Sequence, residues 1–498
     1  MKRLLFLATP LVLFATSHIT SVTAITKVYG DGEHIAKIVL SYDAPILASS
    51  LSSDDFSVEG RQIVKAALSD AAGTQTGAKS SKFIALDLAP LAFSGSPASP
   101  NKPKSLGKGG PKLNSLGNPK QIPDIKASIS QTGTLQTATA TYPAGKSVSV
   151  DIRGSSMSEE AWQEAVQKAA AQRASEAKNT QNKTPNLTPA SHENSIVKTA
   201  QNSAQLSDLA TSSLNHPSQS ASKASQTATK SSQSSNNLSK PHSTPQTQAL
   251  RLGVRDFTQH KFIAKDGESL EYNLFIPKDY NASKTYPLVL FMHDAGAVSP
   301  DVLTTLTQGR GAVAWSESAV QDMQSAFVLA PQYSRIMVDD NYAHSADLDR
   351  TIELINELKT RYNIGKIYNS GQSMGGMTSL AMDMLHPGFF AGSYVVASKW
   401  EFSKAANLSG TKLFLIASEN DPGAKPSMDE LTSKLTQIGR CVKRLEIDAK
   451  SADLNARVAS LFSPDCDVYY LIFKGGDHRY TWQYGYDITP ALIWLLKG

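Results

Sequence analysis

Residues 367–376 read IYNSGQSMGG, and this stretch decides the fold of the second half of the chain. A short apolar strand runs directly into the pattern G-x-S-x-G from Gly371 to Gly375, and an apolar helical stretch follows as far as Leu385. Such a tight strand-to-helix turn holds its serine in a strained backbone conformation, and small residues on either side relieve the crowding. The pattern therefore predicts that Ser373 is a nucleophile at the start of a helix.

A nucleophilic serine needs a base, and that base needs a carboxylate to orient it. In sheets with such a turn, these groups follow the chain order Ser, then Asp or Glu, then His. Acidic residues follow the apolar strand at 412–417, and a histidine follows the apolar strand at 468–473. Because the carboxyl ends of parallel strands meet at one crevice, we expect Asp421 to orient His478 as the base. Glu419 is the second choice for the acid.

The reaction of such a serine also places negative charge on a carbonyl oxygen, which two backbone N–H groups normally receive. We expect one donor from Met374, directly after the serine. The other is expected from Asp294 or Ala295, in the loop that follows the strand at 287–292. The Asp294 side chain should point away, because a carboxylate repels an oxyanion. His293, in the same loop, is expected to have a structural role only.

Two further residues are candidates for substrate contact. Gln372 precedes the serine and Trp482 follows the expected base, so both are candidates for the lining of a pocket. Packing in the core explains Trp482 equally well, because large aromatic side chains are buried in any domain. We expect Asp477, beside the base, to be a solvated loop residue. The ten histidines are scattered and form no H-E-x-x-H pattern, so we expect no metal and no other cofactor.

The residues around this stretch, 251–498, alternate apolar runs with segments of helical periodicity. Apolar residues at helical spacing predict a helix over 348–362. Residues 261–264 and 270–276 predict a hairpin, closed by a turn at 265–267. Strands that alternate with helices imply a mostly parallel, doubly wound α/β sheet with right-handed crossovers. The expected buried strands are 287–292, 326–330, 367–370, 393–397, 412–417 and 468–473.

The chain before residue 251 is predicted to hold a small β domain and a linker. Alternating apolar and polar residues, as in 36–42, indicate half-buried strands between residues 25 and 153. Residues 94–124 are rich in Pro, Gly, Lys and Ser, and they predict a flexible insert within one β-sandwich. Residues 154–250 hold too few apolar side chains to offset the loss of backbone entropy on folding. We expect a spacer there, with one helix at 158–178.

The first residues indicate export. Lys2 and Arg3 precede an apolar run that ends at Phe14 and is too short to span a bilayer, and small residues follow as far as Ala24. Residues 1–24 therefore predict a signal peptide that is removed. The mature protein is expected to be secreted, either outside the cell or into a periplasm, without a stable membrane anchor.

Composition excludes several classes of function. The 498 residues suffice for two or three domains, and a formal net charge of only +5 does not indicate a nucleic-acid-binding protein. With two cysteines, Cys441 and Cys466, the chain is neither a disulfide-rich scaffold nor a four-thiolate zinc protein. Export permits a bridge between the two, but their spacing alone does not establish one. The oligomeric state is equally open.

These motifs also resemble those of a known family. Residues 252–498 resemble an α/β-hydrolase of the secreted serine esterases, a group that includes polyhydroxybutyrate depolymerase-like and feruloyl-esterase-like enzymes and lies near the prolyl oligopeptidases. Members of this group usually carry a small residue where Asp294 stands. Residues 25–153 resemble the immunoglobulin-like N-terminal domain of some of these esterases. The segments that carry the resemblance of the catalytic part are 293–296, 330–332, 371–376, 421–422 and His478 with Trp482.

The residues and the resemblance together predict a serine hydrolase that cleaves carboxylic esters through an acyl-enzyme intermediate, with Ser373, His478 and Asp421 as its triad. A small or polymer-linked ester is the expected substrate, with its acyl and alcohol parts left open. A prolyl-oligopeptidase-like peptidase is the first alternative, because the same groups cleave amides, although the N-terminal part has no repeated blades. A protein that binds a cell surface or a polysaccharide through its N-terminal domain is the second.

Overall fold

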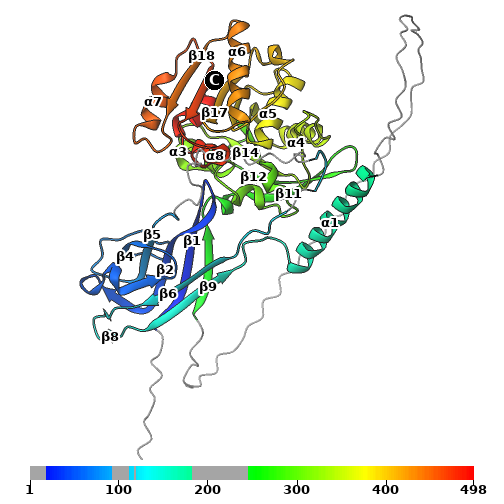
Figure 1. The fold of residues 1–498 in the computed structure, drawn as a ribbon. Helices are drawn as coiled ribbons and strands as arrows, with labels where there is room; N and C mark the ends of the chain where they lie inside the picture. Colours follow the sequence, from blue (N-terminus) through cyan, green and yellow to red (C-terminus); the bar gives the residue numbers. More distant parts are fainter. Residues whose placement is uncertain (1–17, 92–111, 117–118, 182–244, 498) are drawn as a thin grey trace, which may run out of the picture. The chain divides into compact units, whose positions relative to one another are not determined.

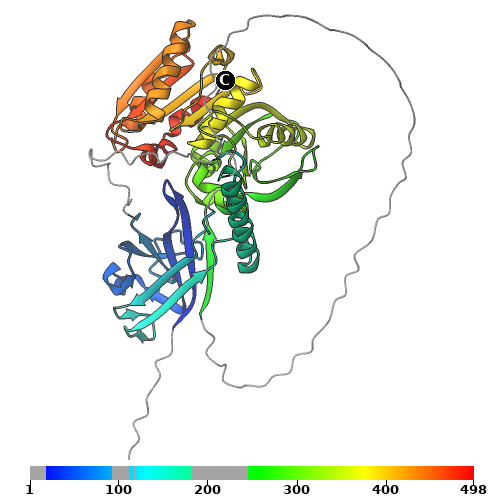
Figure 2. The same cartoon turned by 45° about the vertical axis from the view of Figure 1, so that its right-hand side comes forward.

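The computed structural model describes residues 18–91, 112–116, 119–181 and 245–497 (Figures 1 and 2). Within these ranges the chain forms a β-sandwich, a long helix and a larger α/β part. The N-terminal and C-terminal described residues belong to one compact unit. Most of the linker predicted at 154–250, and most of the insert predicted at 94–124, lie outside the described residues.

A nine-stranded sheet forms the base of the α/β part, in the order β11-β12-β14-β13-β15-β16-β17-β19-β18 (Figure 1). The pairs β11–β12 and β12–β14 are antiparallel, and the other neighbours run parallel, which confirms the predicted fold class. Every residue from Leu288 to Met292 is 0% exposed, because strands of such a sheet are covered on both faces. The strands are β11 (Thr258–Ile263), β12 (Ser269–Phe275), β13 (Tyr286–Met292), β14 (Phe327–Gln332), β15 (Ile364–Gln372), β16 (Gly392–Val396), β17 (Lys412–Ser418), β18 (Val442–Ile447) and β19 (Val468–Phe473).

Helices cover both faces of this sheet. Ser393 of β16 donates a hydrogen bond to Asp383 of α5, and the next residue, Tyr394, packs against Trp315 with ring centroids 5.6 Å apart. Neighbouring residues of a strand point to opposite faces, so α5 and Trp315 lie on opposite sides of the sheet. The helices are α2 (Thr304–Thr307), α3 (Ser318–Gln321), α4 (Asp347–Arg361), α5 (Met374–Leu385), α6 (Ala424–Gln437), α7 (Leu454–Leu461), α8 (His478–Gly485) and α9 (Thr489–Leu496).

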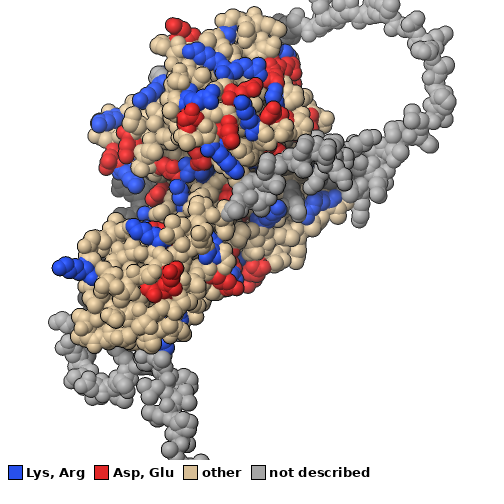
Figure 3. Space-filling model, turned by 60° about the vertical axis from the view of Figure 1, so that its left-hand side comes forward, with Lys and Arg blue, Asp and Glu red and all other residues tan. Residues whose placement is uncertain are grey.

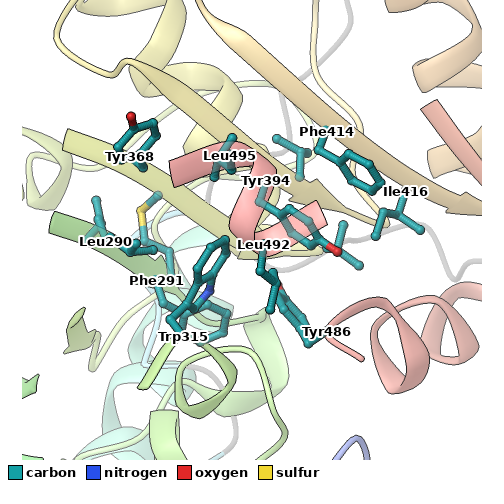
Figure 4. Packing of buried hydrophobic residues seen from close by; sticks show 14 of the residues in the cluster. Leu290, Phe291, Trp315, Tyr368, Tyr394, Phe414, Ile416, Tyr486, Leu492 and Leu495 are labelled. Atoms are coloured by element: carbon teal, nitrogen blue, oxygen red, sulfur yellow. The ribbon is translucent and has the colours of Figure 1, made fainter. Parts of the chain in front are cut away.

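The core on the Tyr394 side is rich in large side chains (Figure 4). Tyr394 stacks on Phe414 at 5.2 Å, and its hydroxyl donates a 2.5 Å hydrogen bond to the backbone oxygen of Gly485. Leu492 and Leu495 of α9 cover these rings. A buried phenol needs such an acceptor, because an unpaired hydroxyl in an apolar core is costly. The contact ties α8 to the centre of the sheet.

The N-terminal part is a sandwich of a five-stranded sheet, β10-β1-β2-β5-β4, and a three-stranded sheet, β3-β6-β9, with a small pair β7-β8. Ile38, Ile84 and Ile129 belong to its buried apolar cluster, which contains residues from both sheets. Alternating burial along β9 places Val148 and Val150 inward, as the sequence pattern predicts. The strands are β1 (Ile19–Tyr29), β2 (Gly32–Leu47), β3 (Phe56–Val58), β4 (Ile63–Ser69), β5 (Ser80–Leu88), β6 (Ile125–Gln131), β7 (Leu135–Gln136), β8 (Thr141–Tyr142), β9 (Lys146–Ile152) and β10 (Gln246–Arg251).

Strand β10 corrects the prediction that residues up to 250 are linker. Its residues 246–251 pair in parallel with β1, and Arg251 forms an ion pair with Glu33 at 2.5 Å. The sequence QTQALR has no apolar alternation, since the strand lies at the edge of the sheet and none of its side chains is fully buried. Backbone pairing with β1 therefore holds this strand in the sheet, and its hydrophobic pattern does not predict a strand.

The start of β1 bears on the predicted signal peptide. The strand begins at Ile19, and the boundary predicted after Ala24 falls inside it. Val22 and Ala24 are each 0% exposed in the sandwich core. The position of any cleavage stays a prediction.

Helix α1 belongs to the predicted linker, and residues 112–116 belong to the predicted insert. Helix α1 (Glu159–Gln181) covers the helix predicted at 158–178 and begins with Glu159 and Glu160, which suits the positive end of a helix. Of the insert, residues 112–116 and 119–124 are described, and Asn114 and Ser115 exchange backbone hydrogen bonds with Ile336 at 3.0 and 2.8 Å. The piece at 112–116 is thus anchored to the α/β part.

A buried carboxylate joins the sandwich to the α/β part. Asp301 is 0% exposed and accepts hydrogen bonds from the hydroxyls of Ser155 and Ser156 at 2.5 and 2.6 Å, and from the N–H groups of Ser156 and Leu303. A buried ion needs this many donors to be tolerated. These bonds attach the segment that follows β9 to the α/β part.

The surface and the remaining short elements complete the description. On the face in Figure 3, basic and acidic side chains intermix over the described residues. Within the described ranges, no helix combines the length and the apolar character needed to cross a membrane. Short 3-10 helices span Ala48–Ser50, Ser53–Asp55, Val254–Asp256, Ala295–Ala297 (η4), Val313–Ser316 and Ala405–Leu408.

Candidate active site

The turn between β15 and α5 has the strained geometry that the G-x-S-x-G pattern predicts. Ser373 has φ 52° and ψ −118°, outside the regions that a side chain with a Cβ prefers. A Cβ added at Gly371 would overlap the backbone of Gly375, and one at Gly375 would overlap the carbonyl oxygen of Met292. Only glycine fits at these two positions, so the pattern is a steric requirement of the turn.

Ser373, His478 and Asp421 lie in one hydrogen-bonded chain. The Ser373 Oγ is 2.9 Å from Nε2 of His478, and Nδ1 of His478 is 2.6 Å from Oδ2 of Asp421. With the proton on Nδ1 shared with the carboxylate, Nε2 is free to accept the serine proton. The structure thus brings together the three residues that the sequence predicts for these roles.

Asp421 is held in its ionised form. Burial alone would raise its pKa, since the residue is 3% exposed. The hydrogen bond and the charge of His478, with the N–H groups of Ala424 and Gly423, outweigh burial and leave the pKa of Asp421 below its ordinary value. Both N–H groups bind Oδ1 at 3.0 Å, so Oδ2 faces the imidazole.

The two other acidic candidates have structural contacts. Glu419 accepts a 2.8 Å hydrogen bond from the N–H of Gly475, so it binds the loop before His478 and not the imidazole. Asp477 was expected to be a solvated loop residue. It is instead the N-cap of α8 and accepts a bond from the N–H of Tyr480. His478 is therefore the first residue of a capped helix.

The loop after β13 surrounds the expected oxyanion donors. Ala295 opens the short helix η4, and Met374 opens α5, so neither N–H is used by the helix that follows it. The Asp294 carboxylate accepts hydrogen bonds from the N–H of Gly296 at 2.7 Å and from the side chain of Gln372 at 3.0 Å. These bonds hold the carboxylate on its own loop and on Gln372.

His293 is buried beneath this loop. Its Nε2 accepts a 3.0 Å bond from the N–H of Tyr333, and its Nδ1 lies 2.8 Å from the backbone oxygen of Asp294. Burial lowers the pKa of His293, because an imidazolium is costly away from water. A neutral ring that donates from Nδ1 and accepts at Nε2 fits both contacts, and it fixes the loop that carries Ala295.

The two pocket candidates differ. Trp482 packs edge-on against His478 with ring centroids 4.9 Å apart, and both line a cavity of about 750 Å³ together with Ser373. Gln372 is 1% exposed and is absent from the lining of this cavity, because its side chain is directed to Asp294. Its described role is to tie the oxyanion loop to the serine turn.

The sequence patterns did not indicate two features of the site. Ser398 donates a 2.9 Å hydrogen bond to the backbone oxygen of Ser373 and supports the turn. Residues 30–35 of the β1–β2 hairpin line the cavity, although they belong to the sandwich. A tight Gly-Asp-Gly turn at residues 30–32 is the signal that could have drawn attention to this hairpin.

The described residues contain a disulfide and no cluster of metal ligands. Over the ranges that the structure covers, no group of three or more His, Cys, Asp or Glu side chains could hold a metal ion. Cys441 and Cys466 form a disulfide with an S–S distance of 2.10 Å. The bridge links the start of β18 to the turn before β19, far from Ser373 in the sequence.

Comparison with known proteins agrees with both parts of the fold. Residues 21–143 match the family model of the esterase Ig-like N-terminal domain, which confirms the resemblance of this region. A thermostable esterase of known crystal structure aligns over 96% of this chain and 99% of its own, with a TM-score of 0.61 and 20% identity. This alignment shows a shared fold across both parts of the chain.

Two other solved structures each cover about half of this chain. A feruloyl esterase module from Clostridium thermocellum covers 49% of this chain and 89% of its own, with 14% identity and a TM-score of 0.35. A structure from a study of two prolyl endopeptidases covers 48% of this chain and 38% of its own, with 12% identity and a TM-score of 0.31. No curated protein matched the sequence.

Proposed function

We propose that this protein is a serine hydrolase that cleaves carboxylic esters through an acyl-enzyme intermediate. The observation that carries the proposal is the chain of hydrogen bonds from Ser373 through His478 to Asp421, on a strained turn beside an open cavity. The matches to an esterase Ig-like domain and to the fold of a thermostable esterase support the choice of esters. The substrate is a small ester or an ester carried on a polymer.

The geometry suggests how each step proceeds. Ser373 attacks the ester carbonyl while Nε2 of His478 takes its proton, and Asp421 stabilises the imidazolium that forms. The N–H groups of Met374 and Ala295 receive the negative charge on the carbonyl oxygen. His478 then protonates the leaving alcohol, and water, activated by the same imidazole, releases the acid. No cofactor takes part in these steps.

The decisive experiment replaces the serine hydroxyl. Ser373→Ala should lower kcat for p-nitrophenyl acetate by about 10⁴-fold or more, because the nucleophile is lost. Ser460→Ala is the matched control, since Ser460 is exposed at the end of α7 and binds only a backbone oxygen of its own helix. A fluorophosphonate probe should label Ser373 in the parent protein. Undiminished hydrolysis by Ser373→Ala would refute the proposal.

The same experiment can include amides. We expect kcat/KM for short esters to exceed that for proline-containing peptide amides, and the reverse order would replace the esterase by a peptidase.

Polymer binding is tested separately, by measuring whether the full chain is retained on cell-wall or plant polysaccharides. Retention without hydrolysis of any ester would favour a binding protein.

Export is part of the same proposal. The basic and apolar residues at the start of the chain support it, and the Cys441–Cys466 bridge suits an oxidising compartment. Cleavage after Ala24 would remove six of the eleven residues of β1, so we expect a cut upstream of Ile19. Mass spectrometry of the N-terminal peptide of exported protein gives the position. A full-length chain retained in the cytoplasm would contradict export.

A further inference from the structure

The cavity beside Ser373 has two walls from different parts of the chain. Ser373, His478 and Trp482 lie on the α/β wall, whereas residues 30–35 and 120–127 lie on the sandwich wall. The volume of about 750 Å³ falls in the range of sites for drug-sized ligands, of roughly 300 to 1,000 Å³. An acetyl ester alone would fill only a small part of it.

The sandwich wall is apolar where the core of the sandwich meets the cavity. Ile35, Val58, Leu88 and Ile125 line the cavity and also belong to the buried cluster of the sandwich. Ile122, which is 6% exposed, also lines the cavity but does not belong to that cluster. These side chains can contact a hydrocarbon group of a ligand, and they carry no polar atom that would need a hydrogen-bond partner.

Several charged side chains on the same wall are already paired. Glu33 accepts bonds from Arg251 at 2.5 Å and from Thr26 at 2.6 Å, and Asp31 lies 3.2 Å from His34. Arg61 donates to the backbone oxygens of Ile35 and Ala89, both at 2.8 Å. Because these groups bind one another or the backbone, the apolar side chains of the wall remain a surface that a hydrocarbon group can contact, beside Glu59, Lys120 and Lys126, which also line the cavity.

We propose that the sandwich wall binds a bulky apolar group of the ester substrate, such as a medium-length acyl chain or an aromatic alcohol. This inference rests on the proposed function, because continuity with Ser373 and His478 is what makes the occupant a substrate. The N-terminal domain then sets the size preference of the enzyme, while the α/β part performs the reaction. Esters with a large apolar group are the preferred substrates.

The test adds a polar group to this wall. Ile122→Asn should lower the ratio of kcat/KM for a bulky ester over p-nitrophenyl acetate by about 10-fold or more, as expected when an apolar pocket loses part of its fit. p-Nitrophenyl octanoate tests the acyl side, and naphthyl acetate tests the alcohol side. Val64→Asn is the matched control, because Val64 is a β-branched residue of the same domain, 63% exposed and away from the cavity.

Leu91→Asn gives a second variant with little risk to folding, since Leu91 lines the cavity but is 42% exposed. A fall in either ratio for Ile122→Asn or Leu91→Asn, with no fall for Val64→Asn, supports the inference. Unchanged ratios in both cavity variants, with parent-like unfolding midpoints, overturn it while ester hydrolysis itself stands. Absence of hydrolysis of every ester by the parent overturns the proposed function, and this inference with it.

Discussion

The α/β part and the sandwich differ in how their strands are buried. The central strands of the α/β sheet are buried on both faces, and the residues of the proposed triad follow three of them in chain order. The sandwich strands alternate, and its larger sheet is completed by β10, more than two hundred residues after β1. The residues of the proposed chemistry thus come from one part, whereas the second wall of the cavity comes from the other. Substitutions made in one part at a time should separate the contribution of the α/β part from that of the sandwich.

The largest effect is expected from a change confined to the α/β part. Asp421→Asn should lower kcat for p-nitrophenyl acetate by about 10³- to 10⁴-fold, because an amide cannot stabilise the imidazolium and favours the wrong tautomer of His478. Glu419→Gln is the control, since Glu419 binds the N–H of Gly475 and not the imidazole. Equal losses in the two variants would contradict the assignment of Asp421.

A substitution in the sandwich should also lower kcat, but by a smaller factor. A Cβ added at Gly30 would overlap the carbonyl oxygen of Gln483 in α8, the helix that begins with His478. Gly30→Ala should therefore displace α8 and lower kcat by about 100-fold, as a shift of about 1 Å at a catalytic group can.

The control for this prediction is another glycine of the sandwich. An added Cβ at Gly77 meets nothing within 4 Å, so Gly77→Ala should keep the parent kcat. Measurement of kcat, KM and the unfolding midpoint distinguishes a displaced base from general destabilisation. A Gly30→Ala enzyme with the parent kcat would show that the hairpin does not position α8.

The smallest effect is expected from a buried acid behind the serine turn. Burial raises the pKa of Asp383 to about 7, although hydrogen bonds from Ser393 and Asn369 oppose this. In the unfolded chain the group ionises near pH 4, so between these values the folded state alone keeps the proton. Stability from this group is therefore full below about pH 4 and is lost as the pH rises to about 7.

Asp383→Asn removes that titration and keeps the size of the side chain. The free energy of unfolding of the parent should fall by about 1 kcal/mol more than that of the variant between pH 6 and pH 8. Urea unfolding at the two pH values provides the measurement. Parallel changes in both proteins would mean that Asp383 does not titrate in this range.

Much of the α/β part was predictable, because its signals are local. Continuous apolar runs mark β13, β14 and β19, and the turn at Ser373 needs small residues for steric reasons within a few positions. The edge strand β18 was missed, since only Ile447 of its side chains is fully buried. Strands that contribute few buried side chains leave little trace in the sequence.

The remaining errors concern contacts between distant residues. The pattern that singles out Gln372 does not reveal that Asp294, 78 residues earlier, accepts its hydrogen bond. Spacing could not decide whether Cys441 pairs with Cys466. The hairpin at residues 30–35 lines the cavity because tertiary packing brings it there. Such contacts depend on the assembled fold, which a pattern along the chain does not contain.

The parallel pairing of β1 with β10 has a consequence for the integrity of the molecule. The described residues before residue 182 and after residue 244 pack together, since β10 joins the sheet of β1 and Asp301 binds Ser155 and Ser156. A protease site engineered into the segment between them would yield two polypeptides that still co-purify. These contacts therefore predict that the two pieces, produced as separate polypeptides, reassemble into one protein.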